Sequence, residues 1–423
     1  MAEKTDFQKR LFQIGVDGVL SAAIALGHRL KLFEALAKVG SEENPAIPAQ
    51  VAEISGCKER YVQEWLSVMG AGDVITVTED EKFFIPKEHI ADLTGGVGIA
   101  LSFFLPVFMR SYDRISDVFR KDGPLGNFPN FSIFKDITRL VSLQGPSTMH
   151  MSYANIRKLD ATAPELPQAP NKREPIRSKI ATNVPWNSGL EYSDFVDFYI
   201  TMATFSEALH RKHLISDFIP ALGPDIKERL EEGGMMCLDV GCGTGFHAAL
   251  LAQNFPNSNF TGIDITLEAV HLANQQRKDN DETFDNLAFI QMDAARMDAD
   301  WTNKYDVVTI FDACHDQMRP DLCLKEIHRV LKPGGVFGML EVNGSSNVYK
   351  DKQELGLVAA QMYGCSMFHC LPVSSNSEYA LGLGAMWGRE RALKLLKEAG
   401  FNDIAVLPTP KFVINVLYVC KKD

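Results

Sequence analysis

The chain has 423 residues, more than one typical domain, and an apolar content of 46%, so we expect at least two domains with a sizeable core. Its net charge of -11 disfavours nonspecific binding to nucleic acid or anionic lipid, because both depend on clustered Lys and Arg. The eight cysteines form no C-x-x-C pair, which excludes a typical disulfide scaffold and favours free thiols in a reducing compartment.

The sequence also gives an expectation for membranes and targeting. No uninterrupted apolar run reaches the roughly twenty residues of a membrane helix. Residues 1–6 lack the hydrophobic region of a signal peptide. We therefore expect a cytoplasmic protein with no membrane partner.

The N-terminal residues 1–100 predict a winged helix. Apolar residues recur at helical spacing from about residue 5 to residue 36. Residues 48–55 and 58–69 predict two further helices, and residues 74–86 a β-hairpin that turns at 79–81. This region carries ten basic and fifteen acidic side chains, a balance that disfavours binding to DNA.

Residues 101–220 predict a helical linker that ends in helices over 195–221. Tyr192, Phe195 and Phe198 either cover a ligand or form an apolar helix face. Residues 126–186 contain a Pro-rich, charged stretch at 163–170, which predicts a flexible insert.

The most informative segment is 236–246, an apolar strand that opens into a glycine-rich loop and then a helix. Gly241, Gly243 and Gly245 allow the backbone to approach a ligand, and the helix presents its free N–H groups. A dinucleotide site needs the spacing G-x-G-x-x-G, but Phe246 occupies the place of the third glycine. The loop therefore indicates a nucleotide-type cofactor and argues against a dehydrogenase.

Further strands follow in the order of a doubly wound α/β sheet. Residues 259–264, 287–295 and 305–311 predict parallel strands, and residues 330–336 lead into a fifth strand at 337–341. Asp264 ends the second strand about twenty residues after the loop, where a carboxylate accepts hydrogen bonds from ribose hydroxyls. The alternative is that such acids cap the next helix.

The glycine loop resembles motif I of the class I methyltransferases, which bind S-adenosylmethionine. The stretches 25–30, 59–66, 311–317 and 381–390 narrow the resemblance to winged-helix S-adenosylmethionine-dependent methyltransferases of actinobacteria and nematodes. This resemblance implies a Rossmann-like, seven-stranded methyltransferase sheet over residues 221–423, closed by an antiparallel hairpin at 401–407 and 413–420. It also implies that the winged helix serves dimerisation and walls off the substrate, and therefore a homodimer.

The same resemblance implies a set of cofactor residues, in which Asp293 reads the adenine amino group. The set consists of Asp239, Gly241, Gly243, Gly245, Asp264, Ile265, Asp293, Ala294, Phe311 and Asp312.

His315, directly after the fourth strand, is our candidate general base. Methyl transfer from a sulfonium needs positioning and, for a protonated acceptor, a base beside the methyl group. Asp316 or Asp312 can orient its other ring nitrogen, and Glu341 faces the same crevice as a second acid. The alternative is that His315 only bonds to a helix end or the backbone.

Residues 343–387 are longer than a usual βα loop and predict a substrate lid, with His369, Trp387 and Met367 as candidate substrate contacts. Ordinary packing is the alternative for these three. Cys365, His369 and Cys370 do not have the spacing of a structural zinc site, so we expect no metal.

Together these features predict a methyltransferase that acts on a small molecule, with oxygen as the acceptor atom. Two alternatives remain open: a winged-helix regulator that senses S-adenosylmethionine without turnover, and a protein or nucleic-acid methyltransferase.

Overall fold

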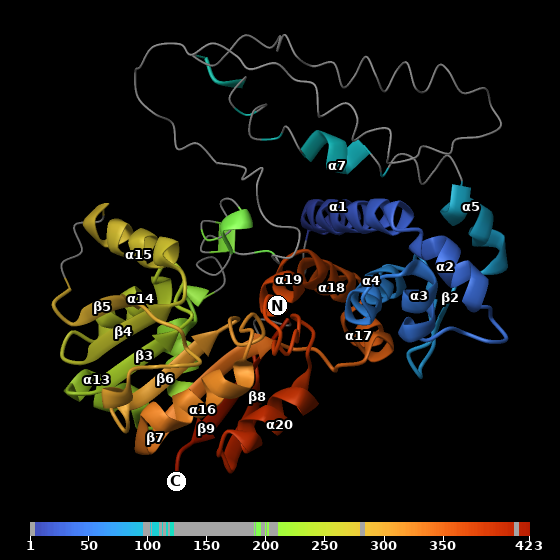
Figure 1. The fold of residues 1–423 in the computed structure, drawn as a ribbon. Coiled ribbons are helices and arrows are strands. Elements are labelled where there is room, and N and C mark those ends of the chain that lie inside the picture. Colours follow the sequence, from blue (N-terminus) through green and yellow to red (C-terminus); the bar gives the residue numbers. More distant parts are fainter. Residues whose placement is uncertain are drawn as a thin grey trace. The chain divides into compact units, whose positions relative to one another are not determined.

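A computed structural model describes residues 5–95, 210–279, 284–409 and 414–423, with short stretches between residues 102 and 202 (Figure 1). The predicted insert at 126–186 lies outside the described residues. Residues 107–183 separate as one unit, while residues 1–106 and 184–423 form the other. The predicted winged helix and the predicted sheet therefore belong to one unit.

The N-terminal module is the predicted winged helix (Figure 1). The single helix expected over 5–36 is instead two, because Lys31 has a left-handed backbone with φ of 57°. The hairpin is short and antiparallel, and pairs Thr76 with Phe84. The elements are α1 (Asp6–Arg29), α2 (Leu32–Val39), α3 (Pro48–Ser55), α4 (Glu59–Ala71), β1 (Thr76–Val77), β2 (Phe83–Phe84), the 3-10 turn η1 (Lys87–His89) and α5 (Ile90–Gly95).

Helix α4 is the buried centre of this module. Trp65 is 1% exposed, and its Nε1 donates to the carbonyl of Ala23 at 3.0 Å. A Cβ on Gly27 would lie 2.4 Å from the Trp65 ring, so the close approach of α1 to α4 requires glycine there. This contact packs the stretches 25–30 and 59–66 against each other.

Helix α1 has the length and mean hydropathy, 1.4, of a helix that can span a membrane. The search for an uninterrupted apolar run in the sequence did not find this helix, because Asp17 interrupts the run of apolar residues. In the structure Val16 and Ala23 are buried, and the helix contacts α2, α4 and α18 (Leu357–Cys365). By length and composition alone, such a helix is weak evidence for a membrane span.

A seven-stranded sheet forms the second module, in the order β5-β4-β3-β6-β7-β9-β8. The first five strands in this order are parallel, and β9 pairs antiparallel with both β7 and β8. The predicted sheet and its end hairpin are therefore confirmed. The strands are β3 (Met236–Val240), β4 (Asn259–Asp264), β5 (Leu287–Gln291), β6 (Tyr305–Phe311), β7 (Leu331–Val342), β8 (Asp403–Pro408) and β9 (Asn415–Lys421).

Helices cover both faces of this sheet because alternate strand residues point to opposite sides. Val307 packs into a cluster with α13 and α14, whereas Val308 packs into a cluster with α16 and α20. The covering elements are η5, a π-helix (Leu214–Phe218), α12 (Ile219–Ala221), α13 (Ile226–Glu232), α14 (Phe246–Asn254), α15 (Leu267–Asp279), η6 (Ala299–Trp301), α16 (Pro320–Val330) and α20 (Arg389–Glu398). The described stretches of the linker include α7 (Phe104–Met109) and η4 (Tyr192–Asp194).

The predicted substrate lid is mostly a helical layer packed on the winged helix. It contains α17 (Val348–Leu355), α18, the π-helix η7 (Ser366–Cys370) and α19 (Leu371–Ser374). Helix α18 contacts both α1 and α4. Ala359, Ala360 and Met367 belong to the same hydrophobic cluster as Trp65. This segment therefore joins the two modules through a shared core.

Candidate active site

An open hollow of about 920 Å³, counted with the space at its mouth, lies where β3, β4 and β6 end. This is the edge where ligands bind in open α/β sheets. The described lining consists of Tyr192, Tyr199, Met202, Gly241, Cys242, Gly243, Thr244, Phe246, His247, Ile263, Asp264, Ile265, Met292, Ala294, Phe311, Asp312, Ala313, Asp316 and Gln317. Seven of the ten predicted cofactor residues are among them; Asp239, Gly245 and Asp293 are not.

The glycine loop shapes one wall of the hollow. Gly241, Gly243 and Gly245 have φ values of 66°, 54° and 81°, which side chains with a Cβ rarely adopt. A Cβ on Gly243 would meet only Tyr199, at 3.9 Å, because this residue faces open space. A Cβ on Gly245 would lie 2.3 Å from the ring of Phe289, so Gly245 is required by packing instead.

Asp264 is positioned at the end of β4 by three donors. Its Oδ2 accepts from the Gly243 backbone at 3.0 Å, and its Oδ1 accepts from the backbone and hydroxyl of Thr266, both at 3.0 Å. Burial raises the pKa of this carboxyl above its usual range. Asp264 lines the hollow with lone pairs still available, as a ribose contact requires.

Asp239 lies on β3 behind the loop and accepts from the Thr309 hydroxyl at 3.2 Å. Burial raises the pKa of Asp239 to about 7. The described lining contains no lysine or arginine to balance these carboxylates. A ligand that carries sulfonium and ammonium charges complements carboxylates in the hollow better than a pyrophosphate does.

The adenine contact predicted for Asp293 has no support from its position. Asp293 is exposed, and its Oδ1 accepts from the Ala295 backbone at 2.9 Å. This is the local capping role that acids at strand ends often have. Its neighbours Met292 and Ala294 line the hollow instead.

Two histidines that the sequence analysis missed lie under the loop. His247 stacks on Phe311 with 4.0 Å between ring centroids, and its Nε2 lies 2.8 Å from Nδ1 of His210. Burial lowers the pKa of His247 well below its usual range and that of His210 to about 4. Both rings are therefore neutral at physiological pH and add no positive charge.

Glu341 anchors the candidate catalytic loop. This residue of β7 has no exposed surface. Its Oε1 accepts from the backbone N–H groups of Cys314 and His315, and its Oε2 lies 2.6 Å from Nδ1 of His315. Trp387 Nε1 donates to the same Oε2 at 3.3 Å. The orienting carboxylate of His315 is thus Glu341, not Asp316 or Asp312 as the sequence predicted.

His315 lies behind the wall of the hollow. Its Nε2 is 3.4 Å from Oδ1 of Asp316, and Asp316, not His315, is among the lining residues. Burial alone would lower the pKa of His315, but the carboxylates of Glu341 and Asp316 raise it well above its usual range.

Asp312 has a strained backbone, with φ of 49°, at the end of β6. It accepts from Asn415 Nδ2 at 2.7 Å, and burial raises its pKa to about 7. Asn415 follows Asp312 by 103 residues, so no local pattern could have paired them.

The three predicted substrate residues separate in the structure. The ring of His369 contacts the rings of Tyr192 and Phe195, at 5.7 and 4.6 Å between centroids. Met367 packs in the winged-helix core, and Trp387 is 1% exposed and holds Glu341. Only His369 therefore has a place beside the hollow, whereas the packing alternative holds for Met367. Phe198 lies outside the described residues.

Comparison with known proteins agrees with this geometry. The family model of a methyltransferase domain matches residues 231–400. The model of the Rv2258c-like winged HTH domain matches residues 18–95. The chain therefore carries a winged HTH domain and a methyltransferase domain. S-adenosylmethionine is accordingly the cofactor of this domain, as the resemblance of the glycine loop to motif I implies.

Curated relatives resemble parts of this chain. A fatty-acid O-methyltransferase of Mycolicibacterium smegmatis is 35% identical over 105 residues, 25% of this chain and 36% of the relative. A protein named S-adenosyl-L-methionine-dependent Diels-Alderase iccD, from Talaromyces variabilis, is 28% identical over 193 residues, 44% of this chain and 62% of the relative. The chain thus spans less than two thirds of the length of either relative.

A solved structure shows the same fold over the whole length. An O-methyltransferase family 2 protein from Planctomyces limnophilus, in complex with apigenin, aligns with a TM-score of 0.55 at 13% identity. The alignment covers 100% of this chain and 97% of that chain.

Proposed function

We propose that the chain transfers the methyl group of S-adenosylmethionine to an oxygen atom of a small molecule, with His315 as general base. The contact of 2.6 Å between His315 Nδ1 and Glu341 is the observation that supports this proposal. The base is the form in which Nδ1–H donates to Glu341 and Nε2 carries a lone pair. Because the carboxylates of Glu341 and Asp316 raise the pKa of His315, the ring must first release its Nε2 proton to reach this form. Asp316 lies between this ring and the hollow, so a rotation of Asp316 exposes Nε2 to an acceptor.

The reaction is an in-line displacement on the methyl carbon. The acceptor oxygen forms the new bond to carbon, the carbon–sulfur bond breaks, and the sulfonium becomes a neutral thioether. The acceptor's proton passes to His315 Nε2. Glu341 and Asp316 then stabilise the imidazolium, as acidic partners of a histidine base do.

We propose an acceptor with an apolar body and a hydroxyl or carboxyl group. The rings of Tyr192, Phe195 and His369 provide an apolar wall beside the hollow. The fatty-acid O-methyltransferase similarity, although limited to a quarter of the chain, supports the same class of acceptor.

The burial of α4 counts against a DNA-binding regulator. In a DNA-binding winged helix the second helix lies in the major groove and must be exposed. Here nine residues of α4 are buried, and α18 covers the helix. The net charge of -11 counts against a nucleic-acid substrate as well.

We also propose that the chain is a cytoplasmic homodimer, as the resemblance to winged-helix methyltransferases implies. Sedimentation of the purified chain tests the dimer, since a monomer at micromolar concentration would contradict it.

Labelled methyl transfer tests the proposed reaction. The full chain is incubated with methyl-labelled S-adenosylmethionine and a panel of apolar alcohols, phenols and carboxylic acids. His315→Ala and Glu341→Gln are expected to lower transfer by about 10²–10⁴-fold, while binding of S-adenosylhomocysteine persists. His271→Ala, which changes an exposed histidine on α15, is the matched control.

Unchanged transfer in His315→Ala would contradict the role of this residue as the base. Binding of the cofactor without label in any acceptor would contradict methyl transfer to these classes. It would instead favour chemistry of the kind named in the Talaromyces relative or a sensor without turnover.

A further inference from the structure

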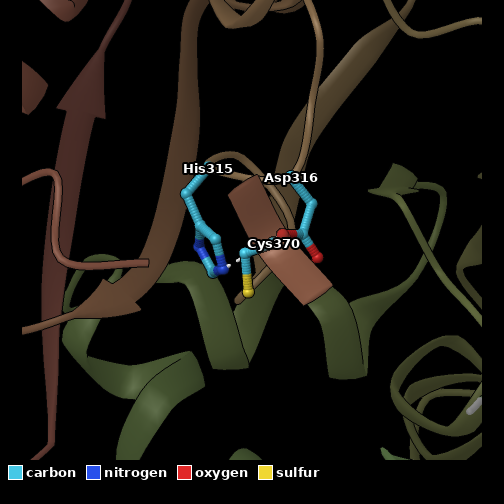
Figure 2. A group of neighbouring side chains, drawn as sticks. All are labelled: His315, Asp316 and Cys370. Carbon is cyan, nitrogen blue, oxygen red and sulfur yellow. Dashed lines mark ion pairs between the residues drawn. The ribbon is translucent and has the colours of Figure 1, made fainter. Parts of the chain in front are cut away.

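His315, Asp316 and Cys370 point their donor atoms toward one another (Figure 2). The three ligand atoms, one imidazole nitrogen, one carboxylate oxygen and one sulfur, all lie within 4.8 Å of each other. Two of the residues come from the loop after β6, and Cys370 ends the π-helix η7. The proposed methyl transfer uses His315 and Asp316 but not the sulfur of Cys370.

The spacing suits a tetrahedral zinc ion. Zinc binds nitrogen and oxygen at about 2.0–2.2 Å and sulfur at about 2.3 Å, which places neighbouring donors about 3.3–3.8 Å apart. The distance of 3.4 Å between His315 Nε2 and Asp316 Oδ1 already meets this requirement. The sulfur needs a shift of about 1 Å at most, within the reach of a side-chain rotation.

Glu341 supplies the supporting contact that zinc-binding histidines usually have. A histidine that binds zinc through one nitrogen donates its other N–H to a carboxylate or carbonyl. Here Nδ1 of His315 lies 2.6 Å from Glu341, which leaves Nε2 for the metal. This contact, made by a residue outside the three donors, is a second observation that suits a bound cation.

The charges of the cluster suit a divalent cation. A carboxylate from Asp316 and a thiolate from Cys370 balance the two charges of the ion, and Asp312 adds a further carboxylate nearby. The lining residues of the hollow include no lysine or arginine that would repel a cation. Because Asp316 lines the hollow, the fourth coordination position opens toward it.

We propose that His315, Asp316 and Cys370 form a binding site for a zinc-class divalent cation, and that the bound cation inhibits methyl transfer by occupying His315 Nε2. Zinc forms a bond to the Cys370 sulfur, and the thiol proton is released to the solvent. The inhibition rests on the proposed role of His315 as the base, whereas the binding does not. This donor set replaces the combination of Cys365, His369 and Cys370, whose sequence spacing led us to expect no metal.

Metal binding is tested by titrating the untagged full chain with Zn²⁺ against a chromophoric chelator. One ion per chain is expected. Cys370→Ser is expected to weaken zinc binding on the order of a hundredfold, and Glu341→Gln about 10–100-fold. Cys365→Ser, which changes an exposed thiol on the same helical segment, is the control and retains wild-type affinity. Binding of S-adenosylhomocysteine verifies that each variant is folded.

Two further measurements separate a built site from incidental binding. Co²⁺ in place of zinc is expected to give a thiolate charge-transfer absorption that Cys370→Ser lacks. Mg²⁺ is not expected to bind, because thiolate and imidazole are poor ligands for it. Equal zinc affinity in wild type and Cys370→Ser, or equal binding of Mg²⁺, would overturn the site.

The inhibition is tested separately in the methyl-transfer assay. Zinc is expected to suppress transfer in the wild type, a chelator to restore it, and Cys370→Ser to require a higher zinc concentration for the same effect. Binding that depends on Cys370 without any detectable transfer would support the metal site and contradict the proposed reaction. Transfer that persists at saturating zinc would overturn the inhibition and leave the reaction standing.

Discussion

Gly243 is the residue whose side-chain space we expect the cofactor to occupy. Its φ of 54° and the open space before it mean that an added methyl group strains the loop and enters the hollow. Gly243→Ala is expected to weaken binding of S-adenosylhomocysteine at least tenfold, about 1.4 kcal/mol, by calorimetry.

Gly18→Ala provides the matched control, because nothing lies within 4 Å of a Cβ at this position of α1. This change is expected to leave binding intact and to stabilise the helix by about 0.5–1 kcal/mol. Equal binding by both variants would show that the loop does not face the cofactor.

Asp239 makes the stability of the folded chain depend on pH. Its carboxyl has a pKa of about 7 in the folded chain against a reference of 3.8, so the folded chain keeps a proton that the unfolded chain loses first. Its contribution to stability is complete below about pH 4 and is lost as the pH rises through about 7. Without cofactor, Asp239→Asn is expected to melt higher than wild type by a margin that grows from about pH 5 to about pH 8. A margin that is constant across scanning calorimetry experiments at these pH values would contradict the assignment.

At the scale of elements, the sheet could be predicted because its signals are local. The strand at 259–264 agrees with β4 at both ends, and alternate residues such as Val307 and Val308 serve opposite faces. The segment 343–387 could not be predicted in this way. Its helices are stabilised by contacts with α1 and α4, which are more than 250 residues away in the chain.

The site was only partly predictable for the same reason. Gly243, Asp264 and Phe311 lie on motifs with fixed spacing, and the structure brings them to one hollow. The partners of His315 and Asp312 come from β7 and β9, and no short-range pattern specifies which carboxylate or amide meets them.

Arg60 joins α4 to the segment that precedes α20. Its guanidinium donates to the carbonyls of Gly382 and Leu383 at 3.2 and 2.8 Å and pairs with the buried Glu64. Arg60→Ala leaves these three acceptors without their donor and is expected to cost about 1–3 kcal/mol of unfolding free energy. Chemical denaturation measures the loss. Arg10→Ala, at an exposed position of α1, is the control and is expected to change the free energy of unfolding little. An equal loss in both variants would show that the contacts of Arg60 do not stabilise the fold.

For the whole molecule, the net negative charge and the carboxylates of the hollow both favour a cationic ligand. The chain has a net charge of -11, and its hollow gathers carboxylates without a basic residue in the described lining. We expect such a charge distribution to disfavour polyanions and to favour a compact cation. Helix α4 of the winged helix packs into the internal core, where nine of its residues are buried.

Calorimetric titration of the full chain with S-adenosylmethionine, S-adenosylhomocysteine and NAD⁺ tests the cofactor assignment most directly. Both adenosyl compounds are expected to bind once per chain, NAD⁺ to give no heat of binding, and Asp264→Ala to lose the adenosyl compounds while remaining folded. Binding of NAD⁺, or a folded chain to which neither adenosyl compound binds, would contradict the assignment.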